Sequence, residues 1–159
     1  MKLDPIPHFE NIDGYSLELH HYEGFIFKKA IYEYQANLLR PLTFVSFDNV
    51  EYRPDNHLLT DMASVPSVLQ AIPGLSKDRH LLPCIFHDSA YCKGGLYVRT
   101  PTSNKFKFIP MERVEADDLL RLMCQFDLAP SPLMAWAYWL GVRLCGQWSW
   151  QRGDWRKRG

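Results

Sequence analysis

The sequence predicts an α+β fold, in which N-terminal antiparallel strands and hairpins are followed by three or four helices packed on the sheet. In the first sixty residues, apolar and polar side chains alternate in part, and aromatic and β-branched residues are frequent, as is typical of strands. From Pro66 onward, apolar residues recur with helical spacing instead. Strands that precede helices in this way indicate an α+β arrangement.

The strands are predicted in three groups. GYSLELHHYEGFIFKKAIYEY, residues 14–34, supplies two or three antiparallel strands with turns at its glycines. LTFVSFDNVEYRP, residues 42–54, supplies a further pair, and a loop follows at residues 54–56. One more extended segment or hairpin is expected at residues 95–110, because its Thr-Ser-Asn run is a turn signal.

The first two helices are bounded by proline and glycine. A short helix is predicted at residues 67–72, where Pro73 and Gly74 end it. A second lies within residues 79–94 and begins near Leu82, because the proline at position 83 is tolerated only in a first turn.

Two longer helices follow. Residues 112–127 form an amphipathic helix, and residues 132–146 form a helix that is apolar nearly all round and is therefore predicted to be largely buried. The apolar face of the first of these is expected to consist of Val114, Leu119, Leu122, Met123 and Phe126.

Composition limits the function classes. The chain of 159 residues has 47% hydrophobic residues and is expected to form a single domain at residues 1–147, with an aromatic and basic tail at residues 148–159. Its 18 basic and 18 acidic side chains balance, which argues against nucleic-acid binding as the principal function. No secretory signal is expected, and the longest apolar run has about twelve residues against the roughly twenty that span a bilayer. We therefore expect a soluble protein.

The four cysteines are Cys84, Cys92, Cys124 and Cys145. No two of them form a CxxC pair, which argues against a zinc ribbon or a thioredoxin-like site. Each lies in an apolar stretch, so reduced core thiols are predicted.

His87, Asp88 and Tyr91 are the first candidates for chemistry. On a helix, His87 and Tyr91 are four residues apart and share a face, and Asp88 can line the same groove. Histidine titrates near neutrality, and a neighbouring carboxylate either orients it or binds a cation. The alternative is a half-buried structural pair. The surrounding Leu, Cys, Ile and Phe residues favour a functional pair, because a charge is costly there unless it is paired or used.

The stretch TDMASVP, residues 60–66, is predicted to be a tight strand-to-helix turn. Asp61 is either a metal ligand or an acceptor that shapes the turn. Ser64 is better explained as a helix cap than as a nucleophile, because the GxSxG pattern is missing, although a triad of Ser64, His87 and an aspartate stays open.

Asp117 allows two interpretations. It is spaced four residues from both Arg113 and Arg121, which predicts a solvated ion-pair ladder along the helix. Alternatively it turns inward, and Asp61, His87, Asp88 and Asp117 then form a cluster suited to Mg²⁺, Mn²⁺ or Zn²⁺ and an activated water. His57 and His80 are conceivable additional metal ligands, whereas His8, His20 and His21 are expected to lie on the surface.

The order of these motifs resembles the phage-associated family known as domain of unknown function 1353. TDMASVP, FHDSAY, EADDLLRLM and AYWLGVRLCGQW occur in the order of that family's elements, over residues 40–148. Met62 departs from the glycine usual there, and Ser89-Ala90 replace larger residues. The matching positions are Thr60, Asp61, Ser64, Pro66, His87, Asp88, Tyr91, Asp117, Arg143 and Gly146.

The resemblance implies a product of a tailed phage or prophage, in the host cytoplasm or associated with the virion. Our leading hypothesis is a metal-dependent hydrolase in which His87, Asp88, Asp61 and Tyr91 are catalytic and Asp117 completes the ligand set. The rival is a non-enzymatic tail, baseplate or assembly protein. In that case the cluster is structural, and the C-terminal tail, rich in Trp and Arg, docks on other phage structural proteins.

Overall fold

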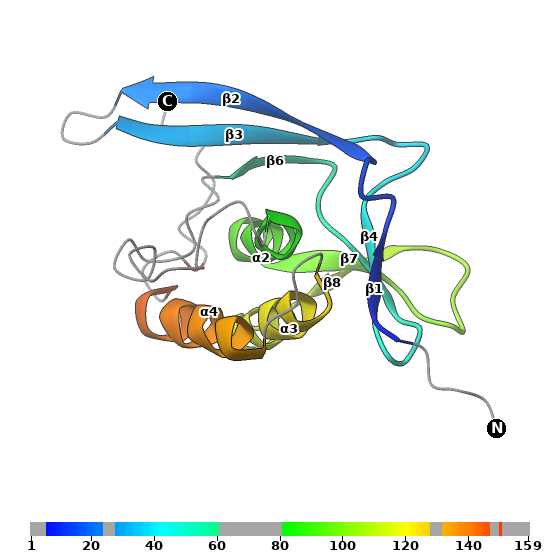
Figure 1. The fold of residues 1–159 in the computed structure, drawn as a ribbon. Helices are drawn as coiled ribbons and strands as arrows, with labels where there is room; N and C mark the ends of the chain where they lie inside the picture. The colour runs from blue at the N-terminus through cyan, green and yellow to red at the C-terminus, as the bar shows by residue number, and fades with distance from the viewer. Residues whose placement is uncertain (1–5, 24–27, 61–80, 128–131, 147–149, 151–159) are drawn as a thin grey trace.

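The protein, seen here as a computed structural model, has the predicted α+β architecture, with two antiparallel sheets and three helices packed on them (Figure 1). The structure describes residues 6–23, 28–60, 81–127, 132–146 and 150. The strands are β1 (His8–Glu10), β2 (Tyr15–Glu23), β3 (Lys28–Ala36), β4 (Thr43–Val45), β5 (Glu51–Arg53), β6 (His57–Thr60), β7 (Gly95–Arg99) and β8 (Lys107–Pro110). The helices are α2 (Leu81–Lys93), α3 (Arg113–Gln125) and α4 (Pro132–Cys145).

One sheet has five strands in the order β1-β4-β5-β7-β8, and the other has three in the order β2-β3-β6. The long β2–β3 hairpin runs in register from Tyr15 opposite Ala36 to Glu23 opposite Lys28. β6 pairs with the other side of β3, and this pairing places Thr60 at the end of β6. The predicted strands at residues 14–34, 42–54 and 95–110 are therefore confirmed.

Helix α2 lies at the centre of the molecule, where it contacts β6 of one sheet, β7 of the other, and α3 (Figure 1). Because it is enclosed on all these sides, every residue from Leu82 to Tyr91 is buried. Pro83 lies in its first turn, as predicted, and Gly94 ends it with a left-handed φ of 76° that suits glycine. Any polar side chain on α2 is consequently drawn into the core.

Helix α3 differs in part from its predicted apolar face. Leu119 and Met123 are buried as expected, but Val114 is exposed, and Leu120 and Cys124 are buried in its place. The reason is that α3 is covered on two sides, by α2 and by α4, so its buried surface is wider than a single stripe.

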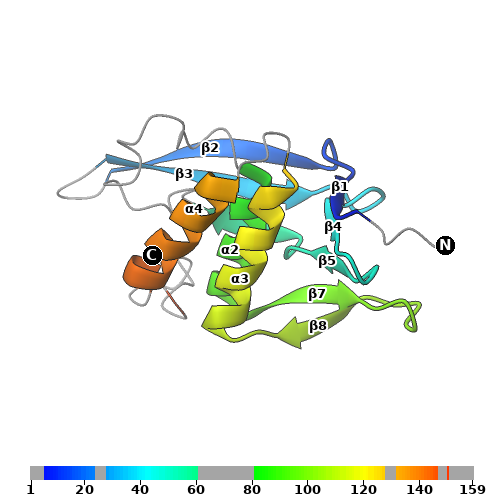
Figure 2. The same ribbon diagram turned by 60° about the horizontal axis from the view of Figure 1, so that its bottom comes forward.

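Helix α4 is not largely buried, contrary to the prediction. Ala135, Tyr138 and Val142 pack on α3, but the opposite face of the helix is exposed. Figure 2 shows α4 beside α3, its packing partner among the described elements. No helix in the described ranges is long and apolar enough to cross a membrane.

Several predictions lie outside the described residues. They are the helix at residues 67–72, the tail apart from Trp150, and the side chain of Cys145. Cys84 and Cys124 are buried and Cys92 is half-buried, as expected for thiols of the core. Burial raises the pKa of the Cys124 thiol, with a further contribution from Asp127, so this cysteine is a poor nucleophile.

Candidate functional site

Asp117 lies at the centre of a buried polar network between α2, α3 and α4. Its side chain is 0% exposed. Oδ1 lies 3.0 Å from Nε2 of His87 and accepts a 2.5 Å hydrogen bond from the Tyr91 hydroxyl. Oδ2 accepts a 3.2 Å hydrogen bond from Nη1 of Arg143. Asp117 therefore has partners on both oxygens, and all of them come from other helices.

This geometry decides between the two interpretations of Asp117 in favour of the inward one. The spacing of four residues from Arg113 and Arg121 predicted an ion-pair ladder, yet the carboxylate points away from the surface toward α2. The inward orientation follows because Ala116, Asp117 and Leu120 lie on the face that α3 buries. Arg113 instead donates from both terminal nitrogens to the backbone carbonyl oxygen of Arg143. Each nitrogen lies 3.4 Å from this oxygen, and the contact joins α3 to α4.

His87 and Tyr91 contact Asp117 together because they are one turn apart on α2. Their ring centroids lie 4.0 Å apart. Tyr91 is also contacted edge-on by the Trp150 ring, with centroids 4.9 Å apart. A carboxylate can only accept hydrogen bonds, so the short contact places a proton on Nε2 of His87.

The other ring nitrogen of His87 has a different environment. Nδ1 is buried, and within the described part of the chain no group hydrogen-bonds to it. Among the described residues, Oδ1 of Asp88 is an ionisable neighbour of Nδ1, and it lies 4.0 Å away, beyond hydrogen-bonding distance. The other oxygen of Asp88 accepts a hydrogen bond from the Thr60 hydroxyl, which fixes the orientation of the carboxylate.

The two carboxylates determine the charge of His87. Complete burial lowers the pKa of the imidazole, but the interactions with Asp117 and Asp88 outweigh it, so the pKa of His87 lies above its ordinary value of 6.5. Burial likewise acts to raise the pKa of Asp117, but hydrogen bonds from His87, Tyr91 and Arg143 leave it lowered. The pKa of Tyr91 is raised, by burial first and by Asp117 second, so its hydroxyl stays a donor.

Sequence reasoning from the residues alone did not find two supports of this site. Arg143 is the only charged residue of α4. A single charge in an otherwise apolar helix indicates that the side chain has a partner of opposite charge within the protein. Gly146 lies against Tyr91: a Cβ atom at this position would lie 2.6 Å from the Tyr91 hydroxyl. Only the family resemblance had singled out these two positions.

Other predicted site residues lie elsewhere or outside the described residues. Asp61, Ser64 and His80 belong to the latter group, so neither the turn at residues 60–66 nor a Ser64 triad is tested. His57 contacts the carboxylate of Glu33 on the neighbouring strand, which gives it a partner in the sheet.

The residues that the structure describes do not form a complete metal site. In that part of the chain, no group of three or more His, Cys, Asp or Glu side chains is placed to hold a metal ion. Asp117 is also poorly suited to this role, because its oxygens already accept hydrogen bonds and the Arg143 guanidinium lies beside it. The best remaining donors are Nδ1 of His87 and Oδ1 of Asp88, and the predicted third ligand is Asp61.

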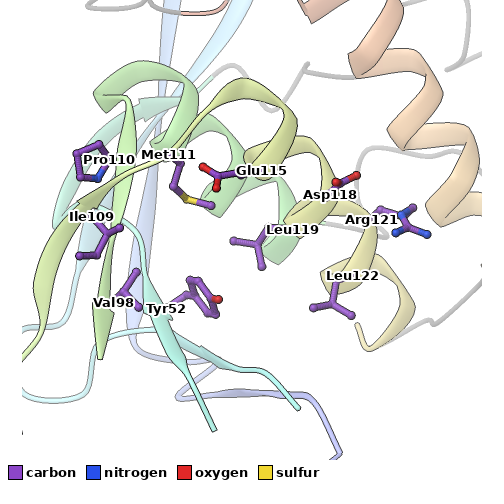
Figure 3. A pocket seen from close by; sticks show the side chains of 10 residues that line it. All are labelled: Tyr52, Val98, Ile109, Pro110, Met111, Glu115, Asp118, Leu119, Arg121 and Leu122. Carbon is purple, nitrogen blue, oxygen red and sulfur yellow. The ribbon is translucent and has the colours of Figure 1, made fainter. Parts of the chain in front are cut away.

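The network does not line a pocket that the described residues form between α3 and the five-stranded sheet. This pocket, of about 500 Å³, lies between α3 and the strands β5, β7 and β8 (Figure 3). Its apolar wall includes Val98, Ile109 and Met111, and Glu115 lies at its edge. None of the network residues His87, Asp88, Tyr91 and Asp117 lines it.

Comparison of this chain with protein-family models, curated proteins and solved structures finds no match. The resemblance to the phage-associated family therefore stays a prediction. The residues that it singled out nevertheless lie in one connected set of contacts wherever they are described, namely Thr60, His87, Asp88, Tyr91, Asp117, Arg143 and Gly146.

Proposed function

We propose that this chain is a phage or prophage hydrolase in which His87 is the acid–base residue. The observation that carries the proposal is the asymmetry of the imidazole. Nε2 is bound to a fixed carboxylate, whereas Nδ1 is buried without a hydrogen-bond partner among the described residues and faces Asp88. A purely structural buried histidine is expected to have hydrogen bonds at both nitrogens.

In this proposal each residue has a separate task. Asp117 holds the tautomer and orientation of His87, and Tyr91 and Arg143 hold Asp117. Nδ1 of His87 takes a proton from a water or substrate hydroxyl and returns it to the leaving group. Asp88, oriented by Thr60, stabilises the positive charge of the imidazole while it carries that proton.

In a metal-dependent form of the hydrolase, Nδ1 of His87 would be a ligand and not the acid–base group, because its one lone pair cannot bind a cation and accept a proton at once. The divalent cation would be held by Nδ1 of His87 and by Asp88, with Asp61 as the predicted third ligand, and it would supply a water of lowered pKa. Asp117 then acts as the carboxylate that orients a metal-bound histidine, rather than as a ligand itself.

A non-enzymatic role in the virion or its assembly is the second candidate. It is favoured by the burial of the network, since His87, Asp88 and Asp117 are only 3%, 6% and 0% exposed. A buried hydrogen-bonded network of this kind can hold α2, α3 and α4 together. The three helices would then form a rigid surface on which other virion proteins dock.

The experiment that separates the candidates compares the wild type with His87→Gln and, as a matched control, His8→Gln on the exposed edge strand β1. Hydrolysis of p-nitrophenyl acetate and bis-(p-nitrophenyl) phosphate is followed with and without added Mg²⁺, Mn²⁺ or Zn²⁺, and the bound metal is measured by elemental analysis. The hydrolase proposal requires activity that His87→Gln reduces by about 10²–10⁴-fold. It also requires that His8→Gln keeps this activity. If neither probe is hydrolysed and His87→Gln changes only thermal stability, the structural role is correct.

A further inference from the structure

Helix α4 has an exposed apolar stripe on the face opposite to α3. The stripe consists of Leu133, Trp136, Leu140 and Leu144, which are 73%, 50%, 52% and 70% exposed. Their spacing of three and four residues places them on one side of the helix. A surface helix of a monomer ordinarily has polar residues there, so the stripe needs an explanation.

We propose that this stripe is the interface of a symmetric homodimer, in which α4 packs against α4 of a second copy. The order of the residues suits antiparallel pairing about a two-fold axis. In such a pair, Leu133 faces Leu144 of the other copy and Trp136 faces its Leu140, so one surface complements itself. Helices that pack through a stripe of this spacing bring their axes to about 8–10 Å.

The size of the stripe agrees with a dimer. A large side chain has on the order of 150–250 Å² to bury, so the exposed fractions amount to roughly 450 Å² of apolar surface in one copy. Two copies bury roughly twice that, just below the ~1,000 Å² that a specific interface should exceed, so residues that flank the stripe have to contribute the remainder.

The charges around the stripe are compatible with a second copy of the chain. Arg143 is the only charged residue of α4, and it is turned toward Asp117. Arg121 of α3 stacks on the ring of Trp136, one of the stripe residues, at 4.3 Å, and Asp118 accepts a 2.7 Å hydrogen bond from Trp139. Among the described residues, these two neighbours of the α4 tryptophans have opposite charges, and the whole chain has a formal net charge of zero. Two copies therefore do not repel each other.

An uncharged face does not suit nucleic acid or an amphipathic membrane helix. Nucleic acid needs a cationic surface to meet its phosphates. Helices that lie on membranes combine an apolar face with lysine and arginine on the polar face, whereas the other face of α4 is packed on α3 through Ala135, Tyr138 and Val142.

The test is sedimentation equilibrium of the full chain over a wide range of concentrations. The wild type is expected to show a dimer of twice 18.6 kDa in equilibrium with the monomer. Leu140→Asp at the centre of the stripe, and Leu144→Asp as a second variant, should raise the dissociation constant about a hundredfold or more, because each dimer then buries two carboxylates. Leu140→Met should keep the dimer.

Leu39→Asp is the matched control, because Leu39 is 93% exposed in the segment between β3 and β4. This variant should dimerise like the wild type, and circular dichroism should show that all variants are folded. A wild type that is monomeric at every concentration overturns the proposal, as does a Leu140→Asp variant that still dimerises. A monomer that binds phosphatidylcholine vesicles through the stripe overturns it in favour of a lipid surface.

Discussion

Oδ1 of Asp117 lies 3.0 Å from Nε2 of His87, and neither side chain is more than 1% exposed. The two residues come from different helices and are thirty positions apart in the sequence. Their contact joins α2 to α3, while Arg143 joins α4 to the same carboxylate. The candidate site and the packing of the helices are therefore one structural unit, and variants of the site should change stability as well as activity.

Asp117→Asn should destabilise the protein strongly. The amide retains one acceptor, yet it cannot accept from His87, Tyr91 and Arg143 as a carboxylate does, and it leaves the positive charge of Arg143 without its buried partner. A loss of about 3–5 kcal/mol in the free energy of unfolding is expected, measured by urea denaturation.

The adjacent Asp118→Asn is a suitable control for this variant, because Asp118 is exposed and, in the described part of the chain, its side chain accepts a hydrogen bond from the Trp139 indole alone. Its effect should stay below about 1 kcal/mol. Equal losses in the two variants would contradict the central role of Asp117.

Stability should depend on pH in two opposite ways. The pKa of His87 is raised, so its contribution is complete below the unfolded value of 6.5 and is lost as the pH rises through the folded pKa. The pKa of Asp117 is lowered, so its contribution is present above its ordinary value of 3.8 and is lost as the pH falls through the folded pKa. The free energy of unfolding should therefore decline above pH 6.5.

Urea denaturation from acid to alkaline pH measures this dependence. The His87→Gln variant should lack the decline above pH 6.5 that is due to His87, so the stability difference between the wild type and this variant should shrink as the pH rises. A difference that is constant across this range would show that His87 has the same pKa in the folded and unfolded chain.

Asp88→Asn should lower the pKa of His87. The carboxylates of Asp88 and Asp117 both favour the protonated imidazole, whereas burial disfavours it. Without the Asp88 charge, only Asp117 opposes the effect of burial on the pKa of His87. Titration of the His87 ring signals by NMR should give a value above 6.5 in the wild type and a lower one in the variant. If the pKa does not change, Asp88 has no electrostatic influence on Nδ1 at 4.0 Å.

Local patterns were sufficient to predict most of the fold. The alternation in the sequences of β2 and β3 predicts two paired strands, as the hairpin register shows, and Pro83 and Gly94 limit α2. These signals act between neighbours in the sequence, so a single chain is enough to interpret them. The pairing of β6 with β3, and of β5 with β7, joins distant segments and carries no comparable local signal.

The errors in the helices have a common cause. The extent of the buried face of a helix depends on how many neighbours surround it, which composition does not reveal. α2 is enclosed by two sheets and α3, so even its His and Asp residues are buried, whereas the more apolar α4 has one face exposed. For the same reason the spacing of Asp117 from Arg113 and Arg121 was compatible with a surface ladder, and only the position of α2 turned the carboxylate inward.

Gly146→Ala should disturb the site through Tyr91. The added Cβ atom would lie 2.6 Å from the Tyr91 hydroxyl, so the ring has to move and its 2.5 Å hydrogen bond to Asp117 is weakened or lost. We expect a destabilisation of about 1–3 kcal/mol, the usual cost of overpacking. In a Tyr91→Phe background the closest atom of this clash is absent, so the same substitution should cost less.

A double-mutant cycle of Gly146→Ala and Tyr91→Phe, measured by urea denaturation, tests this coupling. The two changes should be less than additive, because each removes the same hydrogen bond to Asp117. Additive losses would mean that Gly146 is needed for a reason other than the position of the Tyr91 hydroxyl, and that the C-terminal end of α4 does not control the network.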